Sequence, residues 1–141
     1  MTSGQSLEYE KTNGRIVWGT DTMHIDVSEL DGTRVVTISG RVEHSESRKL
    51  QEALESLVVK NEPKIAADLS RVSYLDSSAL GILVSTLKSA NSRGGDLRLS
   101  GLNDMVMDVF RITRLSSIFQ IHPTISEAVN SFKEENGLPS R

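Results

Sequence analysis

A short apolar segment that leads into a helical repeat constrains this chain more than any other feature. Residues 65–69 read Ile-Ala-Ala-Asp-Leu, a compact run typical of a strand covered on both faces. From about residue 76 to residue 92, apolar side chains recur at helical spacing and form one stripe. The stripe consists of Ala79, Leu80, Leu83, Val84, Leu87 and Ala90. A strand followed directly by an amphipathic helix is the repeating unit of a parallel sheet, so the stretch predicts an α/β fold.

The remaining periodicities repeat this unit after an opening hairpin. Apolar and polar residues alternate over 23–28, and Asp31-Gly32 then predicts a two-residue hairpin turn into the apolar run 35–38. A turn is predicted over 40–44, helices over 50–58, 102–110 and 124–132, and short strands over 97–99 and 118–121. The sequence therefore predicts a single α/β domain over residues 21–134. It should have a mixed, mainly parallel β-sheet, opened by a β-hairpin and packed by about four α-helices.

Composition and the chain ends exclude several classes of protein. A chain of 141 residues with 37% hydrophobic content should form one domain. The net charge of −3 disfavours direct nucleic-acid binding, and no apolar run is long enough to span a membrane. The absence of cysteine and of a signal-peptide pattern leads us to expect a cytoplasmic protein. Residues 1–20 are predicted to be a flexible arm or a strand that covers a sheet edge, and residues 135–141 a frayed tail.

The turn before the helix at residue 76 carries the strongest functional signal. Asp76, Ser77 and Ser78 are all good N-cap residues, so a serine here either caps the helix or is a regulated hydroxyl. Ile82 is predicted to point away from the core stripe, toward Ser78 and Ser85. An apolar side chain surrounded by small hydroxyl side chains, beside an exposed helix start, predicts a docking face.

Catalytic and metal sites are not predicted. The three histidines lack metal-ligand spacing, and no dinucleotide fingerprint or Walker loop follows any strand. Ser77 lacks the G-x-S-x-G elbow of a hydrolase, and a triad of Ser77, His44 and Asp76 is geometrically weak. A receiver domain with Asp68 as phosphoacceptor requires an acidic pair after the first parallel strand to hold Mg²⁺. Residues 38–41 at that place read Ile-Ser-Gly-Arg, so this class is set aside. No cofactor is therefore expected, and the small-hydrolase alternative is retained only as a weak one.

Three sequence motifs resemble those of the STAS family. They are Gly40-x-Val42-Glu43, the run from Asp68 to Gly81 with Asp76-Ser77-Ser78 at its centre, and Gly94-Gly95-x-Leu97-x-Leu99. Within that family, residues 35–132 are similar to the bacterial anti-sigma factor antagonists. Two positions depart from the family pattern: Arg41 stands where an acidic residue is usual, and Arg114 where glycine is common.

The resemblance implies a regulatory binding protein, not an enzyme. It implies that an anti-sigma factor serine kinase phosphorylates Ser77, with Ser78 the less favoured acceptor, and that a metal-dependent serine phosphatase reverses this step. The dephosphorylated form would bind the kinase and release the sigma factor, as a monomer or weak homodimer. The partner-binding residues are expected to be Arg41, Glu43, His44, Asp76, Ser77, Ser78, Ile82 and Ser85. The alternative is a non-phosphorylated STAS scaffold, or a subunit of a larger signalling or lipid-transport complex.

Overall fold

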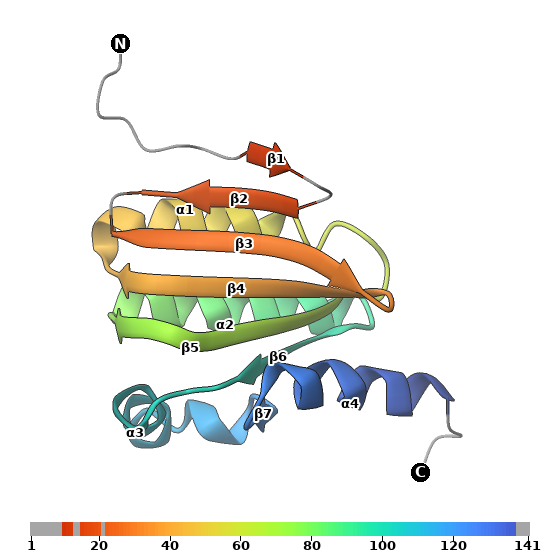
Figure 1. Cartoon of the computed structure of the whole chain (residues 1–141). Coiled ribbons are helices and arrows are strands. Elements are labelled where there is room, and N and C mark those ends of the chain that lie inside the picture. The colour runs from red at the N-terminus through yellow and green to blue at the C-terminus, as the bar shows by residue number, and fades with distance from the viewer. Residues whose placement is uncertain (1–9, 13–14, 21, 138–141) are drawn as a thin grey trace.

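The computed structural model describes residues 10–12, 15–20 and 22–137, which form one mixed sheet with helices on both faces (Figure 1). The strands are β1 (Glu10–Thr12), β2 (Arg15–Gly19), β3 (Met23–Leu30), β4 (Thr33–Val42), β5 (Lys64–Leu75), β6 (Asp96–Ser100) and β7 (Ile121–His122). The helices are α1 (His44–Glu55), α2 (Ser77–Ser92), α3 (Asp104–Ile112) and α4 (Ile125–Gly137), with a 3₁₀ turn η1 (Leu115–Ser117). This architecture confirms the predicted α/β class and the four helices.

The strands lie in the sheet in the order in which they occur in the chain. Neighbours from β1 to β4 pair antiparallel, and neighbours from β4 to β7 pair parallel. The sheet is thus mixed, as predicted. Asp31 and Gly32 both have positive φ angles, 54° and 83°, which is the backbone of a primed turn matched to strand twist. The predicted hairpin is therefore confirmed as β3–β4.

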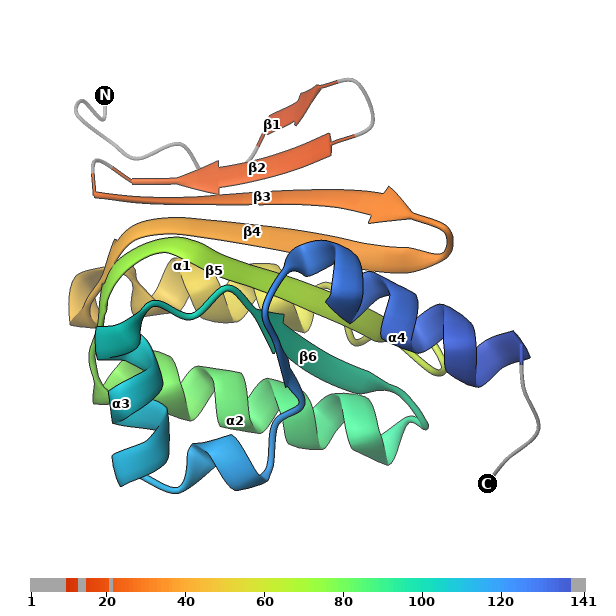
Figure 2. The same ribbon diagram turned by 60° about the horizontal axis from the view of Figure 1, so that its bottom comes forward.

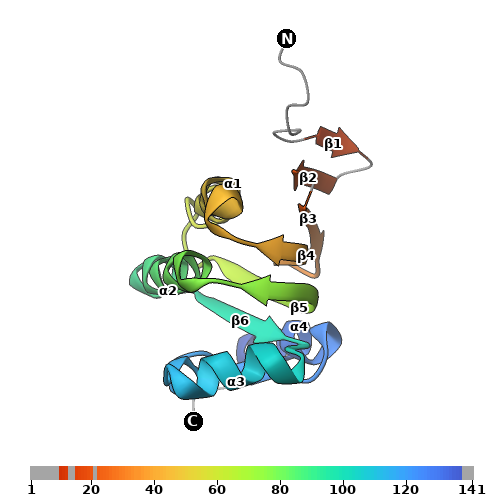
Figure 3. The same ribbon diagram turned by 90° about the vertical axis from the view of Figure 1, so that its left-hand side faces the viewer.

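Two layers of helix cover the sheet, and the core is divided unequally between them. Helices α1 and α2 lie side by side on one face, and α4 packs on the other (Figures 2 and 3). The large hydrophobic cluster lies under α1 and α2 and includes the predicted stripe residues Leu83 and Leu87. The face under α4 holds a small cluster of Ala66, Ala128, Val129 and Phe132. Among the described residues no helix is both long and apolar enough to cross a membrane.

One end of the sheet gathers three helix starts. Strands β4 and β5 end side by side, with Val42 paired to Leu75, and α1, α2 and α3 begin near this end, on the left in Figure 1. We call this end the carboxyl rim. Gly40 shapes it, because its φ is +95° and a β-carbon there would lie 2.1 Å from the carbonyl oxygen of Thr22. Only glycine fits such a close backbone approach without a shift.

Three predicted boundaries are wrong, each for a tertiary reason. The 40–44 turn is reduced to Glu43, because pairing with β5 extends β4 to Val42 and α1 begins at His44. The first predicted helix ends at Glu55, although Leu57 and Val58 beyond it remain buried. The predicted strand 118–121 is reduced to the short β7, which begins only at Ile121, while the Phe119 ring packs edge-on against Phe110 with 5.8 Å between the ring centroids.

The chain ends bear on two further predictions. Strands β1 and β2, from the segment predicted as an arm or an edge strand, extend the sheet beyond β3. Arg15 of β2 forms an ion pair with Asp26 of β3. The rest of the predicted arm, residues 1–9 and 13–14, lies outside the described residues, and so do residues 138–141 of the predicted tail.

Candidate functional site

Asp76 caps α2 and leaves the next residue free. The Asp76 amide donates to the carbonyl oxygen of Val42 at 3.2 Å, and its carboxylate accepts from the amide of Ala79 at 3.1 Å. Ser77 is the first residue of the helix and is exposed. Within the described part of the chain, the Ser77 hydroxyl has no hydrogen-bond partner. Of the three candidate caps, the structure selects Asp76, so Ser77 is not needed to begin the helix.

The start of α1 lies against the start of α2. His44 is the first residue of α1, and its Nδ1 atom lies 3.4 Å from the Ser78 hydroxyl oxygen. Ser78 is therefore partly covered, whereas Ser77 beside it is open to solvent. The structure thus brings together the predicted residues of two segments that are more than thirty positions apart in sequence.

Arg41 and Glu43 form the charged side of the carboxyl rim. The Arg41 guanidinium lies 2.5 Å from the Glu43 carboxylate and 4.6 Å from the centroid of the Tyr74 ring. Both charged side chains are about half exposed, at 52% and 42%. A guanidinium stacked on an aromatic ring and paired with a carboxylate is held in one orientation, although such exposed contacts contribute little to stability.

Glu46 supports the rim from behind and was not singled out in the sequence. Its side chain is buried and accepts hydrogen bonds from the hydroxyls of Thr22 at 2.7 Å, Ser45 at 2.9 Å and Thr20 at 3.5 Å. Burial alone would raise the pKa of this carboxyl, but the hydrogen bonds outweigh it and lower the pKa below its ordinary value of 4.5. The sequence feature that could have identified Glu46 is its position three residues after the N-cap Glu43, which is the acidic position of a capping box.

Ile82 and Ser85 lie farther along α2 and correct part of the predicted docking face. Ile82 is half-buried and packs against the main core cluster, so it does not point fully away from the core. The Ser85 hydroxyl, although exposed, donates to the Ile82 carbonyl oxygen at 3.1 Å, within its own helix. A helical stripe does not show how far neighbouring elements cover its edges, and α1 packs beside α2.

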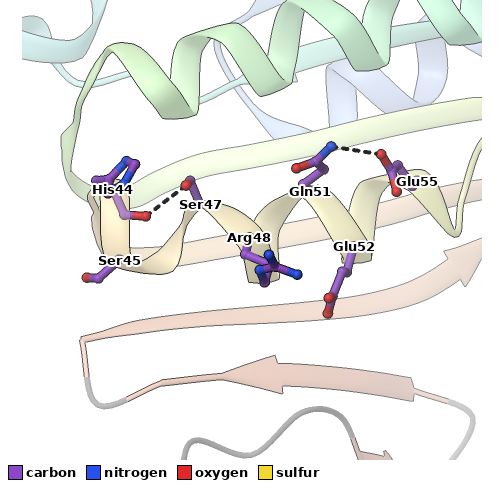
Figure 4. A pocket seen from close by; sticks show the side chains of 7 residues that line it. All are labelled: His44, Ser45, Ser47, Arg48, Gln51, Glu52 and Glu55. Carbon is purple, nitrogen blue, oxygen red and sulfur yellow. Dashed lines mark hydrogen bonds between the residues drawn. The ribbon is translucent and has the colours of Figure 1, made fainter.

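The described residues of the site form neither the predicted weak triad nor a metal-binding group. His44 contacts Ser78, and Asp76 accepts from Ala79, so the hydrogen bonds of a Ser77 triad are not formed among the described residues. These residues also contain no group of three side chains that could hold a metal ion. A hollow of about 640 Å³ lies along α1, with Arg48, Gln51 and Glu52 among its lining residues (Figure 4). It is open and polar, and its Gln51 and Glu55 bond to each other at 3.0 Å, so it lacks the convergent groups of a substrate site.

Comparison with known proteins gives one consistent result. A sequence model of the STAS domain matches residues 24–128. The anti-sigma-B factor antagonist of Listeria monocytogenes is 38% identical over 69% of this chain and 86% of its own length. The anti-sigma-B factor antagonist of Bacillus subtilis is 31% identical over 70% of this chain and 90% of its own.

A solved structure agrees with the sequence comparisons. The crystal structure of an anti-sigma factor antagonist from Mycobacterium paratuberculosis superposes with a TM-score of 0.72 at 26% identity, over 80% of this chain and 96% of that one. Strands β4 to β7 and the segment with the free serine at the start of α2 lie within residues 24–128, which the family model matches. The chain belongs to the STAS domain family.

Proposed function

We propose that this protein is an anti-sigma factor antagonist whose binding surface is the carboxyl rim and whose switch is phosphorylation of Ser77. The unphosphorylated protein binds an anti-sigma factor that is also a serine kinase, and this binding releases the sigma factor. The observation that carries the proposal is the free Ser77 hydroxyl at the exposed start of α2, beside a separate cap at Asp76. Relatives that are 38% and 31% identical and are named anti-sigma-B factor antagonists support it.

The position of Ser77 suits a modification that leaves the fold intact. A phosphoryl group adds a charge of about −1.5 to −2 at pH 7. At the first position of α2 this charge faces free backbone amides and the positive end of the helix dipole, so the folded state tolerates it. Because Asp76 supplies the cap, phosphorylation removes no hydrogen bond of the unmodified protein. The switch therefore acts on binding and not on folding.

The same charge opposes a partner that covers the rim. Phosphoserine would stand directly next to the Asp76 carboxylate, and burying two neighbouring negative charges without counter-ions costs several kcal/mol. Each ~1.4 kcal/mol is a tenfold change in affinity, so charge alone can turn binding off. Ser78 is the less favoured acceptor, because His44 lies 3.4 Å from its hydroxyl and it is less exposed.

The remaining steps need no catalytic group of this chain. The kinase supplies the phosphoryl transfer, and a metal-dependent serine phosphatase in the cytoplasm removes the phosphate. The chain contributes an accessible hydroxyl and a shaped surface. In the alternative role as a non-phosphorylated scaffold or complex subunit, Ser77 would carry no switch, and the experiment below distinguishes the two.

The test measures binding and phosphorylation of defined Ser77 variants. The anti-sigma factor kinases of the same organism are purified one at a time and titrated by calorimetry, with ADP or ATP present. We expect one kinase to bind wild type and Ser77→Ala with similar affinity, and Ser77→Asp at least tenfold more weakly, a difference of ~1.4 kcal/mol. With ATP, mass spectrometry should place phosphate on Ser77 in wild type and in Ser78→Ala.

Ser92→Asp is the matched control. Ser92 is exposed at the far end of the same helix, so this variant adds the same charge to α2 away from the rim. It should bind as wild type does. Equal affinities of the Ser77→Ala and Ser77→Asp variants, or phosphate found only at another residue, would exclude the proposed switch and leave the scaffold role.

A further inference from the structure

An apolar hollow lies next to Ser77 on the carboxyl rim. It is enclosed by the end of β5 and by α3, and its lining consists of Tyr74, Leu75, Met105, Val106 and Val109. The side chains of Met105 and Tyr74 are 52% and 38% exposed, and both are among the large apolar side chains that the described surface leaves open. Single exposed apolar residues are common on protein surfaces, whereas two around one hollow indicate an interaction site.

The hollow is built on rigid elements. Its floor contains Val106 and Leu75, which are 2% and 8% exposed and belong to the main core. Asn103 fixes the start of α3, because its carboxamide accepts from the Val106 amide at 2.9 Å and donates to the Val72 carbonyl oxygen at 3.0 Å. A partner that enters this hollow does not have to order it first, which lowers the cost of binding.

The size of the hollow selects its occupant. Its volume is about 60 Å³, whereas pockets for drug-sized ligands are roughly 300–1,000 Å³. It exceeds the roughly 10–15 Å³ that a water molecule needs, so it admits the end of one side chain. The Arg41 guanidinium lies over the Tyr74 ring beside this small apolar pocket, an arrangement that resembles the centre of a protein interface with a polar group at its edge.

Distance along the chain places the hollow within reach of any protein that binds Ser77. Ser77 is three positions after Tyr74, and an extended chain spans at most ~3.6 Å per residue, so their α-carbons are at most ~11 Å apart. A standard interface covers about 800 Å² on each partner, which as a disc has a radius of roughly 16 Å. A kinase whose active site reaches Ser77 therefore covers the hollow as well.

We propose that this hollow receives an apolar side chain of the anti-sigma factor kinase and is the apolar anchor of that interface. The inference rests on the proposed function and adds the part of the surface that supplies affinity. Ser77 then carries the switch, while Tyr74, Met105 and Val109 hold the kinase in the orientation that presents the hydroxyl to it. Burial of an exposed apolar side chain in such a pocket is a typical source of binding energy.

The test compares two hollow variants with two matched controls. Met105→Glu places a charge at the mouth of the hollow, and Tyr74→Ser removes one wall. Ile112→Glu changes an 81% exposed residue of the same helix that does not line the hollow, and Val59→Glu changes a 64% exposed residue between α1 and β5. All four positions are at least 38% exposed, so thermal melting should show folded proteins.

The measurements are calorimetric affinity for the purified kinase with ADP and the rate of Ser77 phosphorylation with ATP. We expect Met105→Glu and Tyr74→Ser to bind the kinase at least tenfold more weakly than wild type. The two controls should bind within twofold of wild type, and the conservative variant Met105→Leu should also keep its affinity. Unchanged affinity of Met105→Glu, or equal losses in Ile112→Glu, would overturn the inference. An effect of Met105→Glu on self-association in sedimentation, without an effect on kinase affinity, would also overturn it and identify a second copy as the occupant.

The outcomes separate this inference from the proposed function. If wild type binds the kinase and responds to Ser77→Asp, but the hollow variants bind equally well, only the anchor is rejected. If wild type binds none of the purified kinases, the proposed function fails, and the anchor fails with it.

Discussion

Helices α1 and α2 begin side by side on the carboxyl rim, yet their first turns are held in different ways. The start of α1 has no side-chain cap bond from Glu43. Instead, the buried Glu46 carboxylate accepts from the hydroxyls of Thr20 and Thr22, which lie in the turn before β3, and from that of the adjacent Ser45. At the start of α2 the side-chain cap is a single local bond from the Ala79 amide to Asp76, whose own amide donates to the Val42 carbonyl oxygen. The side-chain bonds at the α1 start reach another segment, whereas the side-chain cap of α2 is local and keeps Ser77 open.

This difference separates stability from recognition within one small surface. The Glu46 network ties α1 to the turn before β3 and so fixes the position of His44 and the rim. Because Asp76 alone caps α2, the neighbouring Ser77 can be modified without loss of a native bond. We therefore expect substitutions in the Glu46 network to reduce stability more than kinase affinity, and substitutions of Ser77 to reduce kinase affinity more than stability.

The largest effect on stability is expected for Glu46→Ala. The change leaves the hydroxyls of Thr22 and Ser45 without their charged acceptor, and the net contribution of a hydrogen bond to a charged group is about 1.5–3 kcal/mol. We expect a loss of about 1–3 kcal/mol in the free energy of unfolding, measured by urea denaturation. Glu52→Ala, at an exposed position of the same helix, is the control. A loss no larger than that of Glu52→Ala would remove the contrast between the two helix starts.

The second effect concerns the flank of α2. Ile82→Arg should weaken kinase binding tenfold or more, ~1.4 kcal/mol, because it replaces an apolar side chain near the serine by a charge. Ile82 is half-buried, so some loss of stability is expected as well, moderated because arginine can extend its charged end to water. Val84→Arg, also half-buried but on the other side of α2, should lose similar stability and keep its affinity. Equal affinities of the two variants would place Ile82 outside the binding face.

The third effect distinguishes the cap from the switch. Asp76→Ala should cost about 0.5–2 kcal/mol of stability, the usual loss for an N-cap, whereas Ser77→Ala should change stability by less than about 0.5 kcal/mol. Thermal and urea unfolding measure both. A loss in Ser77→Ala as large as that in Asp76→Ala would show that the serine shares the cap.

The smallest effect is the pH dependence of the α1 start. Because the folded protein holds the pKa of Glu46 below 4.5, the ionised carboxylate adds stability above the unfolded pKa, and this contribution is lost as the pH falls through the folded value. The difference in unfolding free energy between wild type and Glu46→Gln should therefore be largest near pH 7 and shrink below about pH 4.5. Denaturation at pH 7, 5 and 3.5 measures it. A difference that stays constant over this range would mean that the charge of Glu46 contributes nothing.

Short-range patterns carry much of this fold. The Asp31-Gly32 turn, the strand at 65–69 and the helix that starts at residue 77 follow from turn chemistry and hydrophobic period. Gly94 follows the C-cap of α2 in the left-handed conformation that glycine favours at a helix end, with a φ of +83°. These features depend on neighbours within a few residues, so the amino-acid order alone determines them.

What the sequence left open was decided by contacts between distant segments. Asp76, Ser77 and Ser78 are equivalent as caps by residue type, and the structure selects Asp76, whose amide is also bound to Val42. The approach of His44 to Ser78, the Glu46 network and the hollow against α3 join segments that are 24 or more residues apart. Side-chain period shows which face of a helix is apolar, but a neighbouring helix or strand determines which residues at the edge of that face remain exposed.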